Sequence, residues 1–314
     1  MKSGSLGLLT GMIVLCSYSC DQNNSSFEFV QTDQGVGLSE GEIPVLFYQR
    51  EPRSLDGRYI CNNYIHPLYS PGGHILTEEF PSSHPYHRGI FWAWHQVSIN
   101  DRSAGNSWIM QNISHKVTDV QTSIRNNTAR LELDVEWHSS LLENGEPFVR
   151  EQSSIIVHPV AKGLRIIDFE IRLAGLVPGV KIGGADDEKG YGGFCFRMKL
   201  PEDLVFMSSE GPVVPANLQT ESGAWMNFSG SFGNNGGKGG IVIICHRSTP
   251  NYPAPWILRQ KSSMQNIVYP GRHKTEIPVD QPVVLRYRVV VYEGSGSEID
   301  YHKLEAEYNQ ACQG

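Results

Sequence analysis

The chain has 314 residues and a net charge of −7. A negative charge without a basic stripe argues against nucleic-acid binding. The roughly 290 residues after the N-terminal leader are enough for one large domain with a substantial core. Because no linker, internal repeat or low-complexity segment divides them, we predict a single domain over residues 28–314.

The N-terminus has the features of an export signal. Lys2 precedes an apolar run, Leu6 to Cys16, that is too short to span a membrane as a helix. The sequence Ser-Tyr-Ser-Cys, ending at Cys20, is similar to a bacterial lipobox. We therefore expect a signal peptide over residues 1–20, lipidation of Cys20 and a polar tether over 21–27. The alternative is ordinary signal-peptidase cleavage and release.

These features predict an exported bacterial lipoprotein of the periplasm or outer membrane. Its lipid anchor would be its only contact with the membrane, since no other apolar run reaches spanning length.

The remaining chain has the pattern of short strands separated by Gly, Pro and Asn turns. We expect strands at 43–48, 58–64, 89–97, 113–120, 129–137, 149–158, 164–173, 193–200, 225–229, 240–246, 256–259 and 283–293. A loop is expected over 70–83, an irregular segment over 174–191 and a helix over 298–310. This order predicts an all-β fold, a large antiparallel β-sandwich with a short C-terminal helix.

Titratable and aromatic side chains concentrate in the segment from His66 to Val97. It contains five of the eleven histidines, which are His66, His74, His84, His87 and His95. Imidazole groups can accept or donate a proton near pH 7. His66 and His74 have the weaker claim, because they lie in predicted loops and turns.

The strongest candidates are His84, His87 and Arg88, at a predicted junction between loop and strand. On a regular strand, histidines three residues apart face opposite sides, so they share a site only if the backbone is irregular. Pro85 favours such an irregularity. The guanidinium of Arg88 could bind a carboxylate or an oxyanion. The alternative is that the histidines cap a loop or pack in the sandwich.

An acidic, glycine-rich loop at 183–192 provides Asp187 and Glu188. These carboxylates could serve as a base or ligate calcium, although the spacing is not that of an EF-hand. The alternative is a solvated loop. Arg197 follows on the strand that leaves this loop, beside the possible site.

Five tryptophans are candidates for stacking on a sugar ring, with core packing as the alternative; they are Trp92, Trp94, Trp108, Trp225 and Trp256. His246 begins a Pro-rich loop that could form a wall of the pocket.

Metal binding is a further alternative. His84, His87 and His95, with Glu78 or Glu79, could supply nitrogen and oxygen ligands, but the spacing matches no closed zinc motif. We therefore predict no cofactor, with a divalent metal as the alternative. The chain lacks a Gly-x-Ser-x-Gly elbow, a P-loop and a dinucleotide-binding fingerprint.

Four blocks of the sequence resemble one bacterial family, DUF6807, also labelled methane oxygenase PmoA-like. They are residues 69–94, which include TEEFPSSHPYHRGIFWAW, and residues 187–198, 246–259 and 285–294. Tyr86 stands where many relatives would have a further histidine, so the cluster around His84 and His87 contains one histidine fewer. The resemblance implies an exported all-β protein associated with sugar degradation and, by analogy, a galactose-mutarotase-like supersandwich.

Enzymes with the mutarotase-like fold use a histidine acid and a carboxylate base on a sugar ring. Carried over, the resemblance implies His84 or His87 as the acid and Asp187 or Glu188 as the base. Arg88 and Arg197 would hold an anionic or oxyanion group, and Trp92 or Trp94 would stack on the ring.

We therefore expect a carbohydrate-active enzyme acting on a carbohydrate or an oxidised sugar. The reaction would be epimerisation, or glycosidic cleavage by hydrolysis or elimination. One alternative is a non-catalytic carbohydrate-binding lipoprotein. A second is a metal-dependent oxygenase, as the family label suggests.

Overall fold

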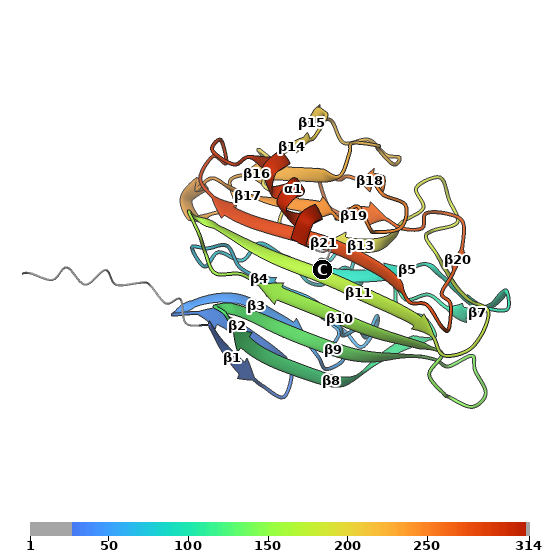
Figure 1. The fold of residues 1–314 in the computed structure, drawn as a ribbon. Helices are drawn as coiled ribbons and strands as arrows, with labels where there is room; N and C mark the ends of the chain where they lie inside the picture. The colour runs from blue at the N-terminus through green and yellow to red at the C-terminus, as the bar shows by residue number, and fades with distance from the viewer. Residues whose placement is uncertain (1–26, 312–314) are drawn as a thin grey trace, which may run out of the picture.

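The structure, a computed structural model, describes residues 27–311. The predicted signal peptide, the lipidation site at Cys20 and nearly all of the tether lie outside this range. Within it the chain forms three antiparallel sheets and one α-helix (Figure 1). This confirms the predicted all-β class with a short C-terminal helix.

Two large sheets form the sandwich. The first has the strand order β1 (Phe27–Gln31), β2 (Gly35–Glu40), β3 (Ile43–Gln49), β4 (Tyr64–Leu68), β5 (Ile90–Trp94), β13 (Gly192–Phe196), β19 (Gln265–Val268) and β18 (Trp256–Ile257). The second has the order β15 (Gly211–Val213), β14 (Val205–Ser208), β16 (Trp225–Gly230), β17 (Gly239–Cys245), β21 (Val283–Glu293), β11 (Leu164–Gly175), β10 (Val149–Val157), β9 (Thr128–Ser139) and β8 (Ile113–Arg125).

A smaller third sheet has the order β20 (Thr275–Glu276), β12 (Val180–Gly183), β6 (Gln96–Ile99) and β7 (Arg102–Gly105). A 3-10 turn, η1, spans Asn234–Gly236. The helix α1 (Tyr301–Ala311) packs Leu304 and Tyr308 on the outer face of β16, β17 and β21 (Figure 1). No helix among residues 27–311 is long and apolar enough to cross a membrane.

The main core lies between the two large sheets. Strands of the second sheet alternate buried and half-exposed residues, as β9 does with Leu131, Leu133 and Val135 buried. By contrast, all five residues of β5 are buried, because both faces of this strand are covered. Ile90, Trp92 and Trp94 point into the main core, and Phe91 and Ala93 enter a second apolar cluster on the outer face.

Several predicted elements are wrong in detail. The strand predicted over 193–200 ends at Phe196, and the segment 174–191, predicted as irregular, contains β12. Residues 58 and 59 are bends, and β4 begins only at Tyr64. The preceding Asn63 has φ of 57°, outside the range of extended backbone. The predicted strand 89–97 is broken at His95, so that β5 belongs to the first large sheet and β6 to the small one.

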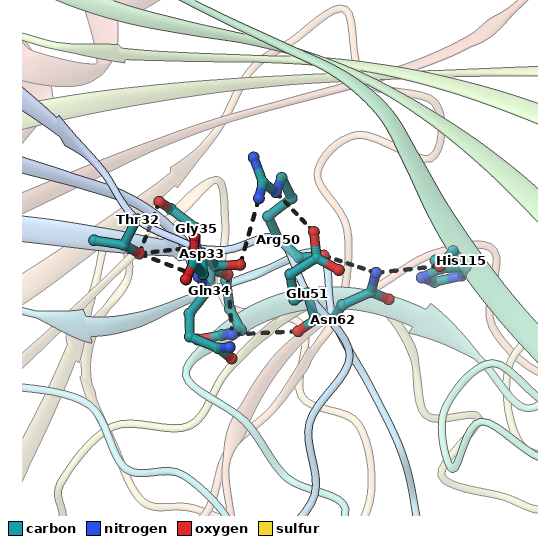
Figure 2. Close-up of polar contacts among 9 residues, drawn as sticks. Thr32, Asp33, Gln34, Gly35, Arg50, Glu51, Asn62 and His115 are labelled. Carbon is teal, nitrogen blue, oxygen red and sulfur yellow. Dashed lines mark hydrogen bonds and ion pairs between the residues drawn. The ribbon is translucent and has the colours of Figure 1, made fainter.

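Asn62 links the two large sheets through its side chain. Its Nδ2 donates to the carbonyl of Arg50, after β3, at 2.9 Å and to the carbonyl of His115, on β8, at 3.1 Å. Figure 2 shows how Arg50 also reaches the β1–β2 turn, through a bond to the carbonyl of Asp33. The N-terminal hairpin is therefore connected to the opposite sheet.

Asn63 makes the second link. Its Nδ2 donates at 2.9 Å to Oε1 of Glu151 on β10, and its Oδ1 accepts from the hydroxyl of Tyr48 at 3.0 Å. Glu151 is completely buried and also accepts from Trp137 Nε1 and Ser153 Oγ, each at 3.0 Å. Burial raises the pKa of Glu151. Three donors therefore converge on one buried carboxyl group between the sheets.

Replacing Glu151 with alanine should destabilise the fold strongly. The change leaves three buried donors without an acceptor, at about 1–3 kcal/mol each, so we expect a loss of about 3 kcal/mol or more in the free energy of unfolding. Glu132→Ala, a half-exposed carboxylate on neighbouring β9, is the matched control and should cost less than about 1 kcal/mol. Equal losses in denaturant titrations would contradict the assigned role.

Candidate functional site

His84 and His87 are brought together by a turn in the segment between β4 and β5. The His87 N–H donates to the His84 carbonyl at 2.9 Å, which closes the turn around Pro85 and Tyr86. The two imidazole rings stack with centroids 4.6 Å apart and planes 4° apart. The condition set by the sequence, an irregular backbone between these histidines, is therefore met.

Gly89 fixes how this segment returns to the sheet. Its φ is +30°, and a Cβ atom there would lie 1.8 Å from the carbonyl oxygen of Ile65 on β4. No other residue type fits this position without moving β4. The Gly89 N–H donates to the carbonyl of Glu78, and its own carbonyl accepts from Arg197 at 2.7 Å. Glu78 and Arg197 are therefore held on either side of Gly89.

Arg197 and Glu78 form a partly buried ion pair beside the histidines. Nε and Nη2 of Arg197 both donate to Oε2 of Glu78, at 2.9 and 2.8 Å. The Arg197 side chain is 4 % exposed and that of Glu78 is 38 % exposed. Nη1 of Arg197 is buried without a hydrogen-bond partner.

The two stacked histidines are unequal. His84 is half-buried, and its pKa is lowered by burial and by the nearby Arg197. His87 is buried, and its pKa falls to about 2 through burial, with His84 and Arg197 adding to the effect. Both rings are therefore neutral near pH 7, and His84 is the one that solvent reaches.

Aromatic side chains form one side of the site. Trp108 lies in a turn after β7, with its ring stacked on His95 at 4.7 Å between centroids and edge-on to His87 at 6.3 Å. Tyr191, just before β13, meets Trp108 edge-on at 5.4 Å. Burial lowers the pKa of His95 to about 4, although Asp187 opposes this shift. The site thus lies on the outer face of the first sheet, opposite α1.

Arg88 lies beneath the site and holds its loops. It is 1 % exposed, and Nη1 donates to the carbonyl oxygens of Tyr86, at 3.2 Å, and Trp108, at 3.3 Å. Its guanidinium carbon lies 4.3 Å from the centre of the Phe91 ring. These contacts give Arg88 a positioning role in place of the predicted direct contact with a substrate.

Of the two predicted carboxylates in the acidic loop, only Asp187 lies near a residue of this site. Asp187 is close enough to His95 to affect its pKa, but its Oδ1 accepts from the backbone N–H groups of Lys189 and Gly190. Glu188 is exposed and lines a separate cavity of about 410 Å³ with Asp187 and Arg272. The predicted pairing of these carboxylates with His84 or His87 is not supported by these contacts.

The five predicted stacking tryptophans offer no face to a ligand, because each is at most 3 % exposed. Trp92, Trp94 and Trp256 are buried in the main core. Trp94 Nε1 donates to the carbonyl of Tyr269 at 2.7 Å, and Trp256 Nε1 to that of Gly223 at 3.0 Å. The prediction that they stack on a sugar is therefore wrong.

His246 lies elsewhere in the molecule. It follows β17, and its buried ring packs edge-on against Tyr308 of α1 at 5.0 Å. Since α1 covers the outer face of the second large sheet, His246 is on the opposite side of the sandwich from His84. The prediction that it forms a wall of the same pocket is wrong.

The possible metal set His84, His87 and His95 is also corrected. No group of three or more His, Cys, Asp or Glu side chains within residues 27–311 is arranged to hold a metal ion. Stacked, parallel rings direct their in-plane nitrogen lone pairs alongside one another, whereas metal ligands must converge. As placed here, His84, His87 and His95 therefore do not form a set of converging metal ligands.

Sequence reasoning named Trp108 only as a possible stacking residue and Glu78 only as a possible metal ligand, and it left Tyr191 out. Trp108 and Tyr191 carry no motif, because they reach His95 from separate loops. Glu78 and Glu79 are adjacent, yet only Glu78 faces Arg197. Glu79 bonds to the hydroxyl of Tyr64 and pairs with Arg53 at 3.1 Å.

The depressed pKa of His87 predicts acid sensitivity. The unfolded chain binds a proton on this ring near pH 6.5 but the folded chain only near 2, so its contribution to stability is complete above pH 6.5 and declines as the pH falls. His87→Phe keeps the stacked ring and removes the titration. Its free energy of unfolding should fall less steeply from pH 6.5 to 4, by up to about 1.4 kcal/mol per pH unit. Parallel profiles would contradict the assignment.

Comparison with known proteins gives one finding. A search of the curated proteins gives no match. The model of a family described as a family of unknown function, DUF6807, matches residues 36–308. This range covers most of the chain, including β2 to β21, the stacked histidines and Arg197. The chain therefore belongs to the DUF6807 family.

Proposed function

We propose that the protein is a carbohydrate-active enzyme that uses acid/base chemistry on a sugar ring, with His84 as its base. The observation that carries this proposal is the stacked pair of neutral histidines beside the buried guanidinium of Arg197. A neutral imidazole reached by solvent can accept a proton near pH 7.

The roles differ from those expected from the sequence. His84 accepts the proton, while the buried His87 holds the ring of His84 by stacking and does not titrate near neutral pH. Tyr86 lies edge-on to both rings, at 5.9 Å from His84 and 4.9 Å from His87. Because burial raises its pKa, Tyr86 keeps its proton and can donate it to the substrate. Arg197 stabilises negative charge that develops on the substrate.

A sugar fits the surroundings of these groups. Tyr191 and Tyr86 are both half-buried and contribute aromatic surface on which a sugar ring can pack its C–H face, whereas the buried Trp108 supports Tyr191 and His95 from within. The large antiparallel sandwich is also compatible with the galactose-mutarotase-like scaffold that the sequence resemblance implies, which stays an analogy. Epimerisation and glycosidic cleavage, by hydrolysis or elimination, both need such a base.

The test compares turnover and binding in parallel for the wild type and His84→Ala. The substrate panel contains neutral, acidic and oxidised (keto) sugars and their glycosides. We expect turnover to fall about 10²- to 10⁴-fold while sugar binding changes little, since the ring moves a proton. His302→Ala, an exposed histidine on α1, is the matched control and should keep full activity.

Two outcomes would contradict the proposal. If His84→Ala keeps its activity, the base lies elsewhere. If the wild type binds sugars but converts none of the panel, the protein is the non-catalytic carbohydrate-binding lipoprotein that the sequence also allows.

We further propose that the protein is exported and anchored through a lipid on Cys20. The support is the short apolar run followed by the Ser-Tyr-Ser-Cys sequence. In a bacterial host, Cys20→Ser should shift the protein from the membrane fraction to the soluble exported fraction, because a lipidated cysteine is what retains it. Wild-type protein recovered without a lipid at Cys20, by mass spectrometry of its N-terminal peptide, would contradict the anchor.

A further inference from the structure

The candidate site contains two buried guanidinium groups, but in the described part of the chain only one carboxylate forms an ion pair with either of them. Arg88 and Arg197 are 1 % and 4 % exposed, respectively. Glu78 pairs with Arg197, but within residues 27–311 no carboxylate forms an ion pair with Arg88, which bonds to carbonyl oxygens and contacts Phe91. The three nearby histidines cannot supply the missing charge, because an imidazole is neutral or cationic. One buried guanidinium charge is therefore left without a counter-ion.

Three buried nitrogen atoms in the same place have no hydrogen-bond partner. They are Nη1 of Arg197, Nε of Arg88 and Nδ1 of His87. A buried donor on a charged group that makes no hydrogen bond is costly, so such atoms are uncommon unless a ligand completes them. A negatively charged acceptor there would satisfy the free donor of Arg197 and would balance the charge of Arg88, since both guanidinium groups lie close enough to His87 to lower its pKa.

We infer that the substrate is an acidic sugar, a uronate whose carboxylate accepts a hydrogen bond from Nη1 of Arg197. This inference rests on the proposed carbohydrate function. Glu78 occupies only Nε and Nη2, so Nη1 remains for the ligand. A carboxylate on a sugar ring matches one free guanidinium donor, and the half-buried Tyr86 beside the histidine pair offers aromatic surface for the ring. A phosphate would call for several donors directed at one point.

The same geometry explains how the ligand reaches the guanidinium. Nη1 is covered from solvent, so a neighbouring side chain must turn aside. His84 is the more exposed ring of the stacked pair and lies close enough to Arg197 for the guanidinium to lower its pKa. A carboxylate bound at Nη1 would therefore lie beside His84.

The experiment measures binding of matched sugars to the purified protein by calorimetry. The pairs are galacturonate with galactose and glucuronate with glucose, and acetate is the simple carboxylate. We expect at least one uronate to bind about tenfold or more tightly than its neutral partner, and acetate to compete poorly, since an added charge contact is worth that much in a buried site.

Two variants with opposite expected effects make the test specific. Arg197→Gln should remove the preference for the uronate. Glu78→Gln should increase uronate affinity, because it removes the carboxylate that competes for the same guanidinium. Arg150→Gln, which breaks an exposed ion pair with Asp134 on the other large sheet, is the control and should change nothing. If Arg197→Gln fails to fold, Glu78→Gln still decides.

Each contrary result has a distinct meaning. Equal affinity for neutral and acidic sugars would overturn the inference and leave the proposed function standing. Acetate competing as well as the uronates would overturn it in favour of a general anion site. Weaker uronate binding by Glu78→Gln would also overturn it. Binding of no sugar at all would overturn both the inference and the proposed function.

Discussion

Two adjacent asparagines, Asn62 and Asn63, connect the large sheets by polar bonds across a mainly apolar interior. Apolar contacts between sheets have little directionality, so a hydrogen bond to a fully buried acceptor helps to fix how one sheet lies on the other. Glu151 is that acceptor for Asn63, and the His115 carbonyl is the acceptor for Asn62. The bonds lie immediately before β4, the strand against which Gly89 packs. The position of the candidate site therefore follows from this polar link.

The site itself depends on interruptions of regular structure. A closed turn stacks His84 on His87, a positive φ at Gly89 returns the chain to the sheet, and a break at His95 turns its ring towards Trp108. Regular strands would have placed the two histidines on opposite faces. The strands form a rigid support, and the irregular segments between them bring the side chains of the site together.

The sequence predicts the fold class and part of the candidate site, namely the histidine pair and Arg197. Strand alternation and turn residues are local signals, which is why most of the long strands and the C-terminal helix are found close to their predicted positions. The histidine pair and Arg197 were recognised because they are unusual residue types at strand boundaries. Alternation could not tell which tryptophans face the core, since both faces of β5 are buried. Nor could it show that Trp108 joins His95, or that Glu78 rather than Asp187 meets the arginine, because these contacts depend on how distant segments pack.

The break at His95 divides the candidate site between chain attached to two different sheets. His84 and Arg197 are carried by chain attached to the first large sheet, whereas His95 and Trp108 come from the segments that lead into and out of the small sheet. Insertions or substitutions around β6 and β7 can therefore reshape the aromatic side of the site without moving the stacked histidines. Under the proposed function, such changes would alter which ligand is preferred and would leave His84 in place.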